Sequence, residues 1–294
     1  MGLVSQDRFK AWMLTGAVTT VIGPAAMAQD EPMVEEQMPS AEAMMADAPE
    51  SAVSGVVGAD LYSHFVSYGA DVWGEGDKAF SGSETINPYA EVAFDFESFT
   101  FAMGVWGDIN DNAASSLGGN IQEIDVYAGI SFDIDKLTVG LTYQEWAYAG
   151  QTEDIVDISL GYDDTGLFGD DFALAPSLTI HNRVAGEGLE EGTVLVAGVE
   201  PGFSLLDSED WTVDLSIPVN VAWVLEDGYF GGDDGFGFVS VGAAVGVPLS
   251  MVPSEYGEWA LNGGVTLYMT EEDVYPSNPD DTFLVYNVGV SLAF

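Results

Sequence analysis

The sequence predicts an all-β protein, an antiparallel transmembrane β-barrel of about 12 strands. Three observations predict this fold class. Apolar and polar residues alternate with a period of two, the alternating segments are long, and strong acidity coexists with 47% hydrophobic residues. A barrel separates the two kinds of side chain, because alternate residues of a strand point to lipid and to the lumen.

The alternation is clearest at the end of the chain. Every second residue from 284 to 294 is apolar, and the residues between them include Asn287, Gly289, Ser291 and Ala293. Residues 124–133, 156–163 and 211–223 show the same pattern. About 12 strands are predicted in this way, near residues 55–68, 86–97, 99–109, 122–133, 137–147, 153–163, 172–183, 193–204, 211–225, 236–248, 258–269 and 282–294.

A soluble sandwich is the alternative for such strands, since its apolar faces would pack against each other. Two features favour the barrel. Many segments exceed the roughly five or six residues of soluble strands. Aromatic residues recur near the predicted strand ends and are typical of the girdles at membrane interfaces; they are Tyr89, Phe99, Trp106, Trp146, Trp211, Trp223, Trp259 and Phe294.

The strand ends and connections are predicted less uniformly. Prolines fall in or beside the segments and mark a strand end or a bulge, because proline cannot donate to the ladder; they are Pro88, Pro176, Pro218 and Pro248. Short turns at 97–98 and 133–136 against long loops at 69–85, 110–121 and 270–281 fit a barrel with short turns on one side. The connections 164–171 and 249–257 do not follow that pattern.

The chain divides into three predicted parts. Residues 1–28 form a signal peptide, with Arg8 and Lys10 before an apolar stretch and Ala26 and Ala28 at the cleavage site. An N-terminal anchor helix is the alternative. Residues 29–52 form an acidic, disordered leader, because they hold too little apolar area to repay the entropy of ordering. Residues 53–294 form the outer-membrane β-barrel.

Charge and composition exclude several classes of partner. The formal net charge is −44, and beyond residue 28 the basic residues are only Lys78, Lys136 and Arg183. Nucleic acid is excluded as a partner, because phosphate binding needs clustered basic residues. The chain has no cysteine, which excludes disulfides and thiolate metal sites.

Ionisable residues at inward positions are the candidate pore lining. They are Asp60, His64, Glu91, Asp95, Asp125, Asp157, His181, Arg183 and Asp214. A wall of carboxylates attracts cations and excludes anions; simple solvation of a polar wall is the alternative. Arg183 is predicted to form an ion pair with Asp157 or Asp214, or else to hold an anionic solute at a constriction.

We expect no catalytic residues and no cofactor. Ser63 and His64 are neighbours in a predicted strand and would point to opposite faces, and the sequence has no Gly-x-Ser-x-Gly. The acidic loops 108–112 and 226–235 carry oxygen ligands that suit loosely bound Ca²⁺ or Mg²⁺, without the spacing of an EF-hand. A solvated loop without a metal ion is the alternative.

Two sequence resemblances bear on function. The terminal alternation that ends in Phe294 resembles the C-terminal signature by which the barrel assembly machinery reads outer-membrane proteins. Residues 57–165 resemble the TorF family of porins, through 87–89 (NPY), 101–107 (FAMGVWG), 123–129 (EIDVYAG) and 141–150 (LTYQEWAYAG). The first strand of that family usually carries Arg-Gly after an aromatic residue; here 62–69 (YSHFVSYG) keeps the glycine and lacks the arginine.

These observations predict a passive, porin-like channel in the outer membrane of a Gram-negative bacterium. Its solutes are small and polar or cationic, and its other partners are outer-membrane lipid and the assembly machinery. A structural or interaction barrel with a plugged lumen and acidic surface loops is the alternative. A lipid hydrolase is a third and weaker hypothesis.

We expect the mature protein to begin near Gln29 and to fractionate with the outer membrane, because of the predicted signal peptide and barrel. Mass spectrometry of the mature N-terminus and membrane fractionation check this. Deleting Phe294 should impair assembly. Recovery of the mature chain from the soluble periplasm would contradict the prediction.

Overall fold

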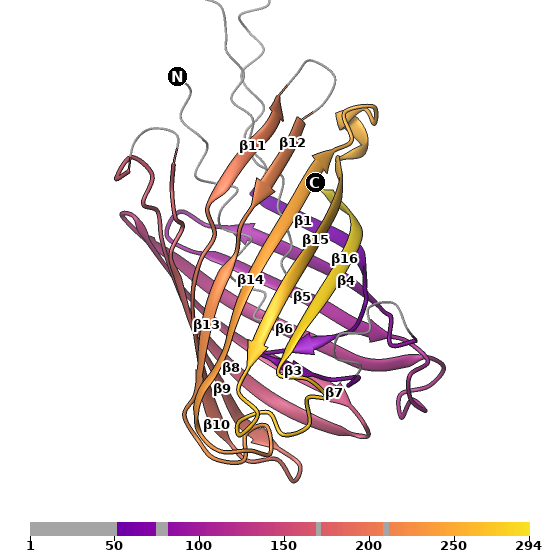
Figure 1. The fold of residues 1–294 in the computed structure, drawn as a ribbon. Coiled ribbons are helices and arrows are strands. Elements are labelled where there is room, and N and C mark those ends of the chain that lie inside the picture. The colour runs from indigo at the N-terminus through magenta and orange to yellow at the C-terminus, as the bar shows by residue number, and fades with distance from the viewer. Residues whose placement is uncertain (1–51, 75–81, 169–171, 208–211) are drawn as a thin grey trace, which may run out of the picture.

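The wall of the protein is one closed antiparallel sheet (Figure 1). The computed structural model describes residues 52–74, 82–168, 172–207 and 212–294. The first half of the wall consists of β1 (Val53–Tyr62), β4 (Thr85–Asp95), β5 (Thr100–Ile109), β6 (Ile121–Ile134), β7 (Leu137–Tyr148), β8 (Gln151–Tyr162) and β9 (Ser177–Gly186). The second half consists of β10 (Gly192–Val199), β11 (Gly202–Asp207), β12 (Thr212–Ser216), β13 (Val219–Val224), β14 (Gly235–Pro248), β15 (Glu258–Thr270) and β16 (Thr282–Ala293).

The ring closes where the first and last wall strands meet. β16 pairs with both β1 and β15, and β15 pairs with β14. β10 and β11 together occupy one position in the ring, because β11 continues β10. β12 and β13 together occupy another, because β13 continues β12. The described residues therefore form a 12-strand barrel, as the sequence predicts.

Proline explains both interrupted strands. Pro201 separates β10 from β11, and Pro218 separates β12 from β13. Each lacks the N–H that an unbroken ladder needs, but its carbonyl still accepts. Ile217 N donates to Pro201 O at 3.0 Å, and Gly242 N donates to Pro218 O at 2.8 Å. The wall thus stays closed across both breaks.

The two faces of the strands differ as the alternation predicts. In β6, Val126 points outward and is 49% exposed, whereas Asp125 points inward and is 5% exposed. The outward apolar side chains form a belt around the ring; on other strands it includes Val57, Ile86, Met103, Leu141, Ile158, Val184, Val241, Leu261, Leu284, Val288 and Val290. Such a continuous apolar belt is unfavourable in water and fits a lipid environment.

Several details differ from the sequence prediction. The segment predicted as 55–68 ends at Tyr62, and the segment predicted as 172–183 begins only at Ser177. Ala175 has a positive φ of 47° directly before Pro176, which prevents an earlier start. Trp106 and Trp146 were expected in an outer girdle, but both are buried on the inward face. Trp211 lies outside the described residues.

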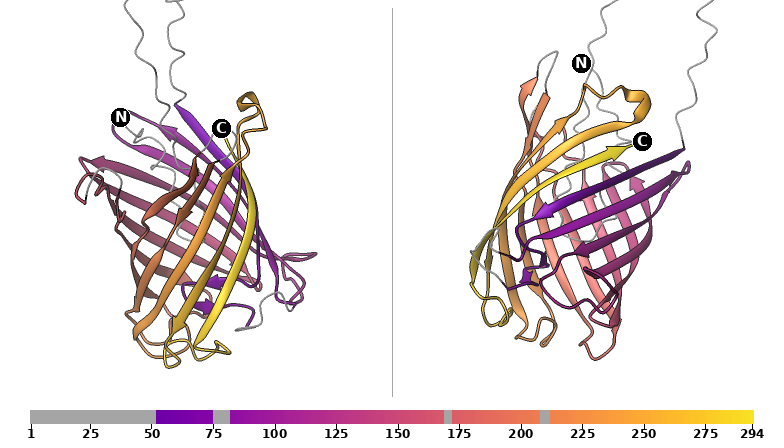
Figure 2. Two further views of the ribbon diagram at one scale, coloured as in Figure 1. Left: turned by 45° about the horizontal axis from the view of Figure 1, so that its top comes forward. Right: turned by 90° about the vertical axis from the view of Figure 1, so that its right-hand side faces the viewer.

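The two ends of the barrel are less asymmetric than predicted. At the end where β1 begins and β16 finishes, the connections 163–176 and 249–257 are long, and a short 3₁₀ helix, Ser254–Tyr256, lies in the second (Figures 1 and 2). At the opposite end, β7 and β8 join through a tight turn of Ala149 and Gly150, both with positive φ. Loop length alone therefore does not distinguish the two ends.

No helix in the described ranges is long and apolar enough to cross a membrane. The predicted signal peptide, 1–28, and the predicted leader, 29–52, lie outside the described residues except for Ala52.

Depth in the apolar belt sets the expected cost of a charge. Val126→Arg, near the middle of β6, should destabilise the folded protein by about 2–4 kcal/mol in lipid, whereas a charge near the interface costs about 0–1 kcal/mol. Ile134→Arg is the matched control, because Ile134 ends the same strand on the same face and is 62% exposed. Urea unfolding in lipid vesicles measures both. Equal costs would contradict a lipid-facing belt.

Candidate functional site in the barrel lumen

The chain leaves the wall after β1 and folds into the lumen. Residues 63–74, here called the inserted hairpin, contain the short strands β2 (Val66–Ser67) and β3 (Ala70–Asp71), which pair with each other. Figures 1 and 2 show them inside the ring of long strands. The turn depends on Gly69, whose φ is 93°, and a Cβ there would lie 2.6 Å from Phe238. Only glycine fits both the backbone and the space.

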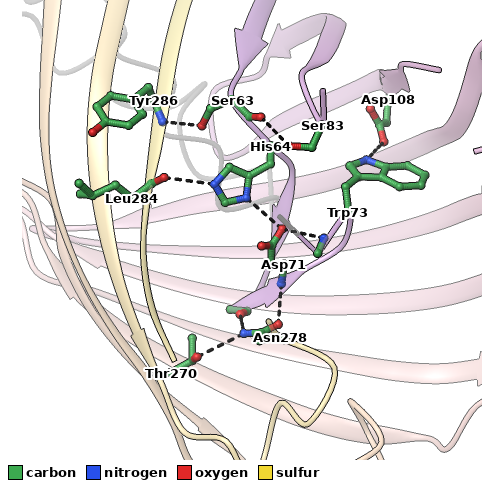
Figure 3. A network of polar contacts seen from close by, with 12 residues as sticks. Ser63, His64, Asp71, Trp73, Ser83, Asp108, Thr270, Asn278, Leu284 and Tyr286 are labelled. Carbon is green, nitrogen blue, oxygen red and sulfur yellow. Dashed lines mark hydrogen bonds and ion pairs between the residues drawn. The ribbon is translucent and has the colours of Figure 1, made fainter. Parts of the chain in front are cut away.

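Side chains replace the strand ladder where β1 ends. Ser63 N donates to Tyr286 O at 2.9 Å, and Tyr286 N donates to Ser63 Oγ at 3.0 Å. His64 Nε2 lies 3.1 Å from Leu284 O (Figure 3). These contacts satisfy the β16 backbone that β1 no longer pairs, which a membrane barrel requires. His64 is therefore buried in the inserted hairpin and does not lie on a strand as predicted.

His64 also fixes the hairpin internally. Its Nδ1 lies 2.9 Å from Asp71 Oδ1, and both side chains are fully buried. A carbonyl and a carboxylate both accept hydrogen bonds, so His64 bonds both when both ring nitrogens carry hydrogen. The ion pair then joins the start of the inserted hairpin to β3 (Figure 3).

The connection 271–281 holds the hairpin from the other side. Tyr275 Oη donates to Tyr68 O at 2.7 Å. Asn278 Nδ2 donates to Gly69 O at 2.9 Å, and Asp71 N donates to Asn278 Oδ1 at 2.9 Å. Tyr275 and Asn278, here called the latch, thus tie the hairpin to the β15–β16 connection.

The hairpin reaches across the lumen to several wall strands. Tyr68 stacks on His181 of β9, with ring centroids 3.9 Å apart. The ring centroids of Phe65 and Trp106 of β5 are 5.1 Å apart, and Trp73 Nε1 donates to Asp108 Oδ2 at 3.0 Å. Contacts on β5, β9 and β16 show that the hairpin spans the lumen instead of lying along one strand.

The inner wall has an acidic half and an apolar half. Carboxylates point inward from β1, β4, β5, β6 and β8, and each is 9% exposed or less: Asp60, Glu91, Asp108, Glu123, Asp125, Glu153 and Asp157. Most apolar side chains that pack with Val66 and Tyr68 of the hairpin are buried on β10, β13, β14, β15 and β16: Val194, Val196, Ala222, Val224, Phe238, Tyr268, Phe283 and Val285. Trp146 of β7 and Ile155 of β8 belong to the same cluster. The hairpin therefore has an apolar surface to pack against.

The predicted lining acids have specific neighbours. Asn262 Nδ2 donates to Asp60 Oδ1 at 2.7 Å, and Tyr127 Oη donates to Glu91 Oε2 at 3.1 Å. Asp95 is half-buried and accepts from Thr100 Oγ1 at 2.6 Å. Asp214 lies opposite Gly246, whose position faces the lumen. Sequence reasoning placed these acids on the inner face but missed Asp108, Glu123 and Glu153.

The structure corrects the predicted partner of Arg183. Its Nε donates to Glu153 Oε2 at 2.6 Å, whereas Asp157 accepts from His181 Nδ1 at 2.7 Å. A bulge between β8 and β9 changes the register beside Arg183. Nη1 donates to Glu190 O and Tyr229 O, and the guanidinium lies 3.9 Å from the Tyr229 ring. Arg183 thus ties two connections to the wall.

Tyr229 lies in the connection between β13 and β14, and Tyr275 lies in the connection between β15 and β16. Burial raises the pKa of both hydroxyls. The phenols stay neutral at ordinary pH, because a buried phenolate would lose its hydration. Tyr275 therefore keeps the proton that it donates to Tyr68 O.

The geometry does not form a hydrolase site at His64. Ser63 Oγ accepts from Tyr286 N, and His64 Nε2 faces a backbone carbonyl. A nucleophile needs a base within hydrogen-bond reach, and His64 uses both ring nitrogens elsewhere. Within the described ranges, no group of three or more histidine or acidic side chains is arranged to hold a metal ion. Asp108, in the first predicted metal loop, lies inside β5 and accepts from Trp73.

The fold and the lumen together define a membrane-type β-barrel with a partly acidic, partly apolar interior and an inserted hairpin. No family model matches the sequence, and no curated protein matches it. The resemblance to TorF porins therefore stays a prediction.

Solved structures of other barrels are similar in outline. The NanC porin matches with a TM-score of 0.45 and 11% identity, over 82% of this chain and 99% of its own. LpxR from Salmonella typhimurium matches with a TM-score of 0.42 and 9% identity, over 81% of this chain and 99% of its own. The translocator domain of the autotransporter NalP from Neisseria meningitidis matches with a TM-score of 0.41 and 14% identity, over 84% of this chain and 90% of its own. Because these TM-scores are below 0.5, no residue role is transferred from these proteins to this chain.

Removing the latch should loosen the inserted hairpin. Asn278→Ala deletes the bonds to Gly69 O and Asp71 N, and each net hydrogen bond is worth about 0.5–1.5 kcal/mol. We expect the local opening free energy of residues 63–74 to fall by about 1–3 kcal/mol. Hydrogen exchange read by mass spectrometry measures it. Asp227→Ala, in another connection, is the control, and unchanged exchange in Asn278→Ala would refute the latch.

Proposed function

We propose that this protein is a narrow outer-membrane channel that prefers small cations and is constricted by the inserted hairpin. The observation that carries the proposal is the charge of the inner wall. The buried inward carboxylates extend over β1, β4, β5, β6 and β8, and Arg183 is the buried basic side chain of the described wall that opposes them.

The energetics of buried charge support this function. An uncompensated carboxylate in a low-dielectric interior costs several kcal/mol. A purely structural core would gain stability from apolar side chains at these positions, as the β10–β16 half of the wall has. Excess carboxylates are retained at low cost when water or mobile cations reach them, and fields of one sign then concentrate cations in the lumen.

The inserted hairpin sets the size of the solute. It contacts strands on opposite sides of the ring, and the seven buried carboxylates of β1, β4, β5, β6 and β8 are each 9% exposed or less. Such close packing favours small solutes and low conductance over a wide pore. A plugged structural barrel would show the same close packing. A conductance measurement therefore distinguishes the narrow channel from the plugged barrel.

The proposed location is the outer membrane of a Gram-negative bacterium. The apolar belt supports insertion in lipid, and the predicted signal peptide supports export. We propose kinship with TorF porins, on the motifs in 87–89 and 101–107, with the barrel assembly machinery as a partner during biogenesis. Loosely bound Ca²⁺ or Mg²⁺ at the acidic connection 226–235 is part of this proposal.

Planar-bilayer recordings in a KCl gradient test the channel. We expect small conductance steps with a reversal potential on the cation side. The preference should fall with salt, because the Debye length shrinks from about 10 Å at 0.1 M to about 3 Å at 1 M. Asp60→Asn combined with Glu91→Gln should move the reversal potential toward neutrality, whereas the exposed Asp233→Asn should change it little.

The absence of conductance steps in correctly folded protein would reject the channel and favour the plugged barrel. A reversal potential on the anion side would reject the role of the acidic wall.

A further inference from the structure

One carboxylate of the inner wall lies between two tryptophans. In the antiparallel register, Asp125 of β6 is directly opposite Trp106 of β5 and directly opposite Trp146 of β7. Directly opposite residues of neighbouring strands point to the same face, with Cβ atoms roughly 4.5–5.5 Å apart. The row Trp106–Asp125–Trp146 therefore faces the lumen together, and Glu153 of β8 continues it opposite Trp146.

Two polar atoms of this row have no partner. Asp125 Oδ1 and Trp106 Nε1 are buried without a hydrogen bond, although Asp125 is only 5% exposed. Trp146 differs, since its Nε1 donates to Gln144 Oε1 at 3.1 Å. A buried carboxylate oxygen without a donor is costly. The Asp125 carboxyl also lies within hydrogen-bond reach of the Glu123 carboxyl on the same face of β6. Asp125 Oδ1 and Trp106 Nε1 are left open to a partner from the lumen, a solute or a water molecule.

The inserted hairpin covers the same row. The rings of Phe65 and Trp106 pack with their centroids 5.1 Å apart. Tyr68 stacks on His181, and the His181 ring stacks in turn on Trp146, with centroids 5.3 Å apart. The row thus lies where the proposed pathway is constricted by residues 63–74. A solute that binds Asp125 meets the hairpin, so this position is suited to select among solutes.

The residue types define the ligand. An anionic oxygen attracts a cation that carries N–H donors, and indole faces attract cations by their quadrupole. A hard metal ion is less suited, because Ca²⁺ takes about six to eight oxygen ligands and Mg²⁺ needs octahedral oxygens, and indoles supply none. Among the residues that the structure describes, no three or more histidine or acidic side chains are arranged to hold a metal ion. An organic ammonium ion uses both the carboxylate and the aromatic rings.

We propose that Asp125, flanked by Trp106 and Trp146, is a binding site for small primary ammonium ions. The ammonium N–H donates to Asp125 Oδ1, and its charge and alkyl carbons contact the indoles. Trp106 Nε1 donates to a water molecule or to a hydroxyl of the solute. The proposal deepens the proposed function, because it names the solute class at the constriction of that channel.

Binding to the purified, folded protein in detergent tests the site without requiring conductance. Saturation-transfer NMR uses butylammonium as the probe. Tetramethylammonium, which has charge but no N–H, and butanol, which lacks the charge, are the comparison probes. We expect butylammonium to bind at least about tenfold more tightly than either, as the loss of a charge-assisted hydrogen bond predicts.

Three variants locate the site. Asp125→Asn keeps the shape and removes the charge, and should weaken butylammonium binding about tenfold. Trp106→Phe should weaken it about two- to fivefold, because phenyl is the weaker cation–π partner. Asp233→Asn, in an exposed loop, should leave it unchanged. If Asp125→Asn does not fold, block of the wild-type K⁺ current by butylammonium, and not by butanol, gives a test without a variant.

The outcomes separate this inference from the channel. Equal binding of the three probes, or butylammonium binding unaffected by Asp125→Asn, overturns the site and leaves a water molecule at Asp125; cation-selective conductance would then still stand. Specific butylammonium binding without conductance upholds the site and rejects the channel.

Discussion

The structure depends on hydrogen-bond closure of the wall, above all at the seam between β1 and β16. A barrel in lipid has no water to satisfy an open strand edge. β1 pairs with β16 only as far as Tyr62 and Asn287, beyond which Ser63 and His64 bond the remaining β16 backbone. Because these two residues complete the seam, the chain can leave the wall and enter the lumen without an unsatisfied edge.

The inserted hairpin in turn depends on the division of the lumen. Apolar side chains from β10–β16 pack with Val66 and Tyr68, so burial of apolar area holds the hairpin in place. From the acidic strands, Trp146 of β7 and Ile155 of β8 join the same cluster, and Phe65 packs against Trp106 of β5. Most of the apolar packing around the constriction thus comes from one half of the wall, and the other half supplies its charge, which explains how a strongly acidic interior coexists with a tightly packed one.

The polar contacts of the lumen form two kinds of connection. His64, Asp71 and Asn278 join the hairpin to the β15–β16 connection, whereas Arg183 joins Glu153 to Tyr229 and to the backbone at Glu190. His64, Asn278 and Arg183 each position a connection. Asp125, whose Oδ1 has no hydrogen-bond partner, is the carboxylate on which solute chemistry is proposed.

The sequence by itself determined the fold class, because the period-two alternation from Val56 to Phe294 is a local property that each strand carries. It placed Asp60, Glu91, Asp125 and Asp157 on the inner face for the same reason. Only the tertiary structure decided that 63–74 leave the wall, that Arg183 pairs with Glu153, and that Trp106 and Trp146 flank Asp125. Those facts depend on register, bulges and packing between distant segments, and no short stretch of sequence encodes them.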